Sequence, residues 1–176
     1  MAPHRKLTPL AAVTRGLIAG VIGTAAMTVA QELSARLQSS GGGGGGGGGA
    51  QEESADPWEQ ASAPAKVAKR IGEGVFQREV SSDLIPVLTH AMHWGYGTGW
   101  GLVYGILAGS DKRARSLPAG LVFGAGVWVM SYVQLVPMGL YGLPWKYPVR
   151  DEAMELSYHL VYGAGASMGF RALTRG

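Results

Sequence analysis

The chain has 176 residues, of which 47% are hydrophobic and only 15% are charged, with a formal net charge of +3. Soluble domains carry about 25% charged residues, so this chain lacks the charge needed to cover a soluble surface. It contains no cysteine, which excludes disulfides, thiol catalysis and thiolate metal sites. Its basic residues form no stripe with interleaved aromatics, so nucleic acid is not an expected partner. We therefore expect a single domain whose main partner is the lipid bilayer.

The first apolar run covers residues 16–30 and follows His4, Arg5 and Lys6. A basic start before an apolar run also describes a secretory signal peptide. Arg15 interrupts the front of this run, however, and no clean small-x-small cleavage site follows it. We therefore expect an N-terminal tail and a retained first transmembrane helix within residues 1–38.

Residues 39–62 form a low-complexity segment that includes nine consecutive glycines at 41–49. Such a run cannot recover the entropy lost on ordering, which predicts a flexible linker. Near its end, Asp56-Pro57-Trp58-Glu59 resembles a helix start, with Asp as the cap and Pro at the first helical position.

Residues 63–80 are short and amphipathic, because Val67, Ile71 and Val75 recur every four residues between charged positions. With Trp58 and Phe76 nearby, this pattern predicts a helix that lies on the membrane surface. The alternative is a helix packed on the loop side of the bundle.

The remaining residues, 81–176, contain three further apolar runs at 84–109, 117–136 and 153–173, of which the last is the least hydrophobic. Between the last two, Tyr141, Trp145 and Tyr147 suit the headgroup layer of a membrane. If four helices alternate in direction, both termini and the basic loop at 111–115 share one side, which the positive-inside rule makes cytoplasmic. We predict an all-α integral membrane bundle of four transmembrane helices with a short interfacial helix in the first outer loop. The expected location is the inner membrane of a bacterial cell.

Glycines recur every four residues on the predicted helices. Small residues let helix backbones approach closely in lipid, where no hydrophobic force drives helices together. We expect these glycines to pack a tight bundle, or to bind a second copy or another membrane protein. The candidates are Gly16, Gly20, Gly97, Gly101, Gly105, Gly109, Gly120, Gly124, Gly165 and Gly169.

A second pattern is polar. If the helices alternate in direction, the rise per residue places several ionisable and amide side chains at similar levels in the outer half of the bundle. Burying such a group in a membrane costs free energy unless it has a hydrogen-bonding or ionic partner. They could fix helix packing by hydrogen bonds, sense or relay protons, or bind a divalent metal. No His-Glu-x-x-His run, nucleophile elbow or phosphate loop occurs, so we predict no catalytic residue and no cofactor. The cluster comprises His90, His93, Glu155, His159, Gln134 and Glu32.

Three segments carry a resemblance to a known family: 93–98 (His-Trp-Gly-Tyr-Gly-Thr), 137–144, and Glu155-x-x-x-His159. Together they resemble the YagU-type bacterial inner-membrane proteins, whose domain has no known function. The resemblance covers the second to fourth helices and, more loosely, the first; the long glycine-bearing outer loop departs from it. It implies a small multi-helix inner-membrane protein, with a loose link to acid tolerance and no catalytic residues to carry over.

The leading hypothesis is a non-enzymatic membrane protein that senses or relays protons through the outer-side His/Glu cluster. One alternative is a divalent-metal-binding membrane protein that serves transport or an enzyme activity. The other is an assembly subunit that packs through its glycine faces.

Overall fold

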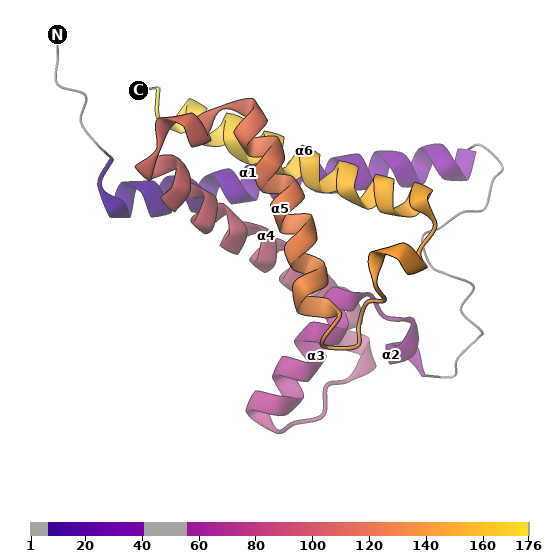
Figure 1. The fold of residues 1–176 in the computed structure, drawn as a ribbon. Helices are drawn as coiled ribbons and strands as arrows, with labels where there is room; N and C mark the ends of the chain where they lie inside the picture. The colour runs from indigo at the N-terminus through magenta and orange to yellow at the C-terminus, as the bar shows by residue number, and fades with distance from the viewer. Residues whose placement is uncertain (1–6, 41–55, 176) are drawn as a thin grey trace, which may run out of the picture.

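The computed structural model of the protein describes residues 7–40 and 56–175, and these form helices and connections without any strand. Four long helices build a bundle: α1 (Pro9–Ser40), α4 (Ile85–Ser110), α5 (Leu117–Leu135) and α6 (Val149–Leu173) (Figure 1). Two shorter helices, α2 (Pro57–Gln60) and α3 (Ala63–Phe76), and three 3-10 turns connect them. The all-α prediction is confirmed for this part of the chain.

The first helix is central to the bundle. It packs along both α4 and α6, while α5 packs on α6. The start of α1, the turn from α4 to α5 and the end of α6 gather at one end of the bundle (Figure 1). The start of α4 and the end of α5 lie near α2 and α3 (Figure 1).

Local signals in the sequence set the helix boundaries. Ser116 caps α5 by accepting a hydrogen bond from the amide of Ala119 at 3.3 Å, and a proline follows in the first turn, where no amide partner is needed. Asp111 ends α4 and caps the 3-10 turn Lys112–Arg115 through the amide of Arg113 at 2.8 Å. These short polar stops divide the apolar sequence into separate helices.

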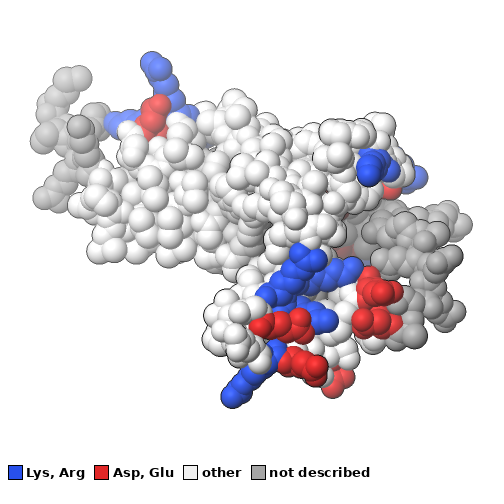
Figure 2. All heavy atoms as spheres, turned by 60° about the horizontal axis from the view of Figure 1, so that its bottom comes forward, with Lys and Arg blue, Asp and Glu red and all other residues white. Residues whose placement is uncertain are grey.

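Two of the helices, α1 and α5, are long and apolar enough to cross a membrane by length and composition. Large apolar side chains such as Val29, Val103, Val122 and Met168 are exposed on the outside of all four long helices. Figure 2 shows Lys, Arg, Asp and Glu gathered at the ends of the bundle and around α3, with an uncharged surface between them.

Close backbone contacts join α1 to α4. A Cβ atom added to Gly16 would lie 2.6 Å from the carbonyl oxygen of Gly101, and one added to Gly20 would lie 2.8 Å from the Cα of the same residue. On the other side of the bundle, Gly120 and Gly124 of α5 meet the backbone of α6 in the same way. Each of the ten glycines singled out in the sequence lies at a contact between two helices, the remaining ones being Gly97, Gly105, Gly109, Gly165 and Gly169.

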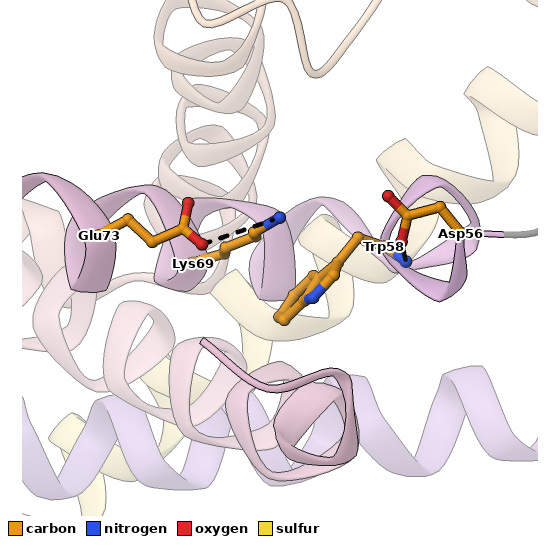
Figure 3. A network of polar contacts seen from close by, with 4 residues as sticks. All are labelled: Asp56, Trp58, Lys69 and Glu73. Carbon is orange, nitrogen blue, oxygen red and sulfur yellow. Dashed lines mark hydrogen bonds and ion pairs between the residues drawn. The ribbon is translucent and has the colours of Figure 1, made fainter. Parts of the chain in front are cut away.

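Helices α2 and α3 are attached to the start of α4. Trp58, Ala61 and Ala65 form a small buried cluster with Ile85 and Leu88. Figure 3 shows Lys69 above the Trp58 ring, 4.9 Å from its centroid, and paired with Glu73 at 3.8 Å. Trp58 is thus buried against the start of α4, while the interfacial position predicted for the helix at 63–80 stays a prediction. The second half of α3 differs, because Ile71, Val75 and Phe76 remain exposed.

Two predicted boundaries shift. The first helix continues to Ser40, and α2 occupies residues 57–60, which the sequence assigned to the linker. The Asp56 side chain accepts a hydrogen bond from the Trp58 amide at 2.9 Å, so the predicted cap nucleates this short helix (Figure 3). The glycine run itself lies outside the described residues.

Candidate functional site

A cavity of about 390 Å³ lies among the four long helices, in the half of the bundle away from the α4–α5 turn. Thr24, Met27 and Gln31 line it from α1, at the spacing of one helix face. α4, α5 and α6 supply the other walls, the connection after α5 contributes Met138 and Tyr141, and α3 adds two side chains at the edge.

Four of the six residues predicted for the polar cluster line this cavity: His93, Gln134, Glu155 and His159. The prediction was wrong for the other two. Glu32 follows Gln31 and is rotated about 100° from it around the helix, so it points outward and pairs with Arg36 at 3.9 Å. His90 is exposed one turn nearer the start of α4 and is not part of the lining.

The hydrogen bonds of His93 identify its tautomer. Its Nε2 lies 3.1 Å from the hydroxyl of Thr28, and that hydroxyl donates its single proton to the carbonyl of Thr24 at 2.9 Å. The Thr28 oxygen can therefore only accept from the ring, so Nε2 carries the proton. In the neutral imidazole, Nδ1 is then the basic nitrogen.

His159 is held in the opposite way. Its Nδ1 lies 2.8 Å from the backbone carbonyl oxygen of Glu155, which can only accept, so Nδ1 donates and Nε2 is the basic nitrogen. Gly124 of α5 packs directly on the backbone carbonyl of His159 and fixes this turn of α6. Each of the two imidazoles is thus anchored through one ring nitrogen and keeps the other as an acceptor.

Tyrosines tie the cavity walls together. Tyr96 of α4 donates to the Gln134 side-chain oxygen of α5 at 3.1 Å, and Tyr162 of α6 donates to the Gly97 carbonyl of α4 at 2.7 Å. Tyr132 of α5 donates to both carboxylate oxygens of Glu152 on α6 at 2.7 and 2.6 Å. None of these tyrosines is among the site residues predicted from the sequence, although each lies on an apolar helix where its hydroxyl needs a partner.

Two further groups complete the polar character of the site. Trp128 lines the cavity, and its indole N–H is buried without a hydrogen-bond partner among the described residues. Tyr141, outside the long helices, is largely covered, and burial together with the negative charge of Glu155 raises its pKa to about 12. Its phenol is therefore neutral at any physiological pH.

The geometry bears on the metal alternative. No group of three or more His, Asp or Glu side chains in the described parts of the chain is arranged to hold a metal ion. His93 and His159 share the cavity, but they do not form a complete ligand set with Glu155.

The fold and the site define the class of this protein. Its described residues form an all-helical fold with two candidate membrane-spanning helices and a partly open cavity lined by two histidines. Comparison with known protein families, with curated proteins and with solved structures gives no match to this chain.

Proposed function

We propose that this protein is a four-helix integral membrane protein that senses pH through the two histidines of its cavity. Helices α4 and α6 would join α1 and α5 as membrane spans. At about 1.5 Å per residue, their 26 and 25 residues exceed the roughly 30 Å of a hydrocarbon core. Exposed Ile106 and Leu107 on α4, and Val161 and Met168 on α6, would face lipid.

The charges at the helix ends support an orientation with both termini in the cytoplasm. The α4–α5 turn carries Lys112, Arg113 and Arg115, and Arg171 and Arg175 lie at the same end of the bundle. Basic residues next to short membrane-spanning segments mark the cytoplasmic side. The cavity would then lie toward the outer side, with Trp145, 76% exposed, at the headgroup level.

The observation that carries the pH proposal is the pair of anchored imidazoles, His93 from α4 and His159 from α6, on a single mostly apolar cavity. Imidazole is the side chain that titrates near neutral pH. Protonation of both rings would place two positive charges in a space that solvates them poorly. Water entry is the simplest way to solvate these charges, so acidification should move the outer ends of α4 and α6 apart.

Other titratable groups face the imidazoles and moderate this effect. α1 and α3 add only uncharged side chains to the lining, Gln31, Pro64 and Val67 among them. His90 lies one turn from His93 outside the lining. The titratable groups in the lining are Glu155 on α6, Tyr96 on α4, Tyr162 on α6, Tyr132 on α5 and Tyr141 after α5.

The test uses the natural lack of cysteine. Val87→Cys and Val149→Cys place spin labels at exposed sites, 61% and 84% accessible, near the cavity ends of α4 and α6. In lipid nanodiscs, double electron–electron resonance spectroscopy should show a longer distance between the two labels at pH 5 than at pH 8. The shift should vanish in His93→Gln/His159→Gln and persist in His90→Gln.

A second label pair, Leu107→Cys with Met168→Cys, serves as the control at the opposite end of the bundle and should not respond to pH. The proposal fails if the first pair does not move, or if it moves equally in the double glutamine variant. Metal analysis of the same wild-type sample separates the alternatives. If the wild type holds one equivalent of metal and the double variant holds none, the protein binds metal through these histidines and the pH-sensing proposal is wrong.

A further inference from the structure

We propose that the cavity binds a small, uncharged, hydroxyl-bearing amphipathic molecule that enters from the lipid phase between α4 and α5, past Tyr96. The inference rests on the membrane embedding proposed above and specifies the ligand class of the same site. Its route and its chemistry follow from separate observations.

The size and walls of the cavity suit an apolar ligand body. Its volume of about 390 Å³ lies within the roughly 300–1,000 Å³ typical of small-molecule sites. Met27, Met92, Met138 and Val127 form much of the wall. Methionine is flexible and polarizable, so such a wall can adapt to ligands of different shape.

The polar groups specify the head of the ligand. His93 Nδ1 and His159 Nε2 are acceptors left over after their partner nitrogens have donated, and the carboxylate of Glu155 is a further acceptor. A ligand that offers a donor satisfies this set, whereas an anionic head would meet a carboxylate and no cation in the lining. A hydroxyl or phenol therefore fits better than a carboxylate or phosphate.

The route of entry follows from a second hollow. A groove on the outer face of α4 is lined by Met92, Gly95, Tyr96, Gly99, Trp100 and Val103. Nothing lies within 4 Å of a Cβ built on Gly95 or Gly99, so the groove is open on its outer side. It shares Met92 and Tyr96 with the cavity, which makes the Tyr96 side chain part of the partition between the two spaces.

The partition is held by side chains. The Tyr96 hydroxyl reaches Gln134 of α5, and its ring packs edge-on against Trp100 with centroids 6.0 Å apart. On the loop side, Pro64 and Val67 of α3 line the edge of the cavity, and Arg70 donates to the carbonyl of Met138 across it. Rotation of the Tyr96 side chain would thus connect the groove with the cavity, while α3 covers part of the loop side.

The experiment uses photolabelling, because it reports location even when the probe partitions into lipid. The full chain in nanodiscs at pH 8 is irradiated with a short alkylphenol that carries a diazirine, or with the methyl ether of the same molecule. Mass spectrometry should find the phenol on residues that line only the cavity, such as Met27 and Met138. The ether should label them about tenfold less, the ratio expected when one buried hydrogen bond is lost.

Two variants test the route. A Cβ on Gly99 meets no atom within 4 Å, so Gly99→Leu places its side chain in the groove, and Gly126→Leu makes the same change at an equally open position on α5. The first should slow cavity labelling about tenfold after rapid mixing, and the second should leave it unchanged. Equal labelling by phenol and ether would overturn the site, and an unchanged rate in Gly99→Leu would overturn the lateral route.

The outcome is separable from that of the pH proposal. Specific phenol labelling at pH 8 without any pH-dependent movement of the spin labels would retain the binding site and discard pH sensing. Movement of the spin labels without specific phenol labelling would retain pH sensing and discard the binding site.

Discussion

The half of the bundle near the α4–α5 turn and the half that holds the cavity contain the same four helices, but they fill the space between them differently. Near the turn, Gly16 and Gly20 bring the backbone of α1 onto Gly101 and Gly105 of α4. A few large side chains, Tyr104 and Phe170 among them, fill what remains and are almost completely buried. In the other half, histidine, glutamine and methionine occupy the facing positions, and the helices leave a partly open cavity between them.

The difference shows that small residues have two opposite effects in this molecule. Where a glycine faces another backbone, as at Gly101, it removes the space between helices. Where it faces outward, as at Gly95 and Gly99, it leaves a groove. Aromatic rings lie where the two halves meet. Phe123 of α5 packs edge-on against Trp100 and Tyr104 of α4, with ring centroids 6.1 and 5.0 Å away. The spacing of glycines alone therefore does not say whether a face is packed or open.

The largest effect is expected when a single methyl group is added to a packed glycine and to an open glycine of the same helix. In Gly101→Ala the added Cβ would meet the backbone of Gly16 and Gly20, so we expect the free energy of unfolding to fall by about 1–3 kcal/mol. In Gly99→Ala, on the same helix with open space around it, we expect no loss and a gain of up to about 1 kcal/mol from helix propensity. Unfolding in mixed detergent micelles measures both. Equal effects of the two substitutions would contradict the comparison.

A smaller effect is expected where the two halves meet. Tyr162→Phe removes the hydroxyl that ties α6 to the Gly97 carbonyl of α4, and should cost about 1 kcal/mol of unfolding free energy. Tyr158→Phe, also on α6 and also buried, removes a hydroxyl without a hydrogen bond among the described residues and should cost close to nothing. If the two variants unfold alike, the Tyr162 contact does not join the halves in solution.

The smallest effect concerns pH at the cavity edge. Burial and nearby Glu155 raise the pKa of Tyr141 to about 12, compared with about 10 in an unfolded chain. The neutral phenol therefore contributes stability that is fully present below pH about 10 and is lost as pH rises through about 12. Wild type should lose more stability over this interval than Tyr141→Phe, and the two should run parallel between pH 7 and 9. Parallel curves up to pH 12 would mean that Tyr141 is exposed.

Much of the helix pattern could be predicted from the sequence, because apolar runs and polar stops report directly on it. The run at 84–109 became α4 at Ile85–Ser110, and the run at 117–136 became α5 at Leu117–Leu135. The last helix starts at Val149 and not at 153, because Arg150, Asp151 and Glu152 are polar but compatible with a helix. A search for apolar runs excludes such residues. The four-span topology stays a prediction.

The sequence predicted how deep in the bundle the site residues lie, but not in which direction each side chain points around its helix. Counting residues along alternating helices placed His93 and His159 at one level, and both line the cavity. The same count could not distinguish Gln31 from Glu32, since adjacent residues share a level and differ by about 100° around the helix. The roles of Tyr96 and Tyr162 depend on which backbone carbonyl or amide happens to lie opposite them, and only the packed structure shows that.

The central place of α1 has a consequence for how the molecule is made. This helix precedes α4, α5 and α6 in the chain, so Gly16 and Gly20 leave the ribosome well before Gly101 and Gly105, which they contact, and before the residues of α6. α1 therefore has no packing partner until α4 has been made, and its contact with α6 forms later still, while α5 and α6 are neighbours along the chain. A chain truncated before α6 would keep the glycine contact between α1 and α4 but would expose the side of α1 around Gly23, against which Tyr162 packs.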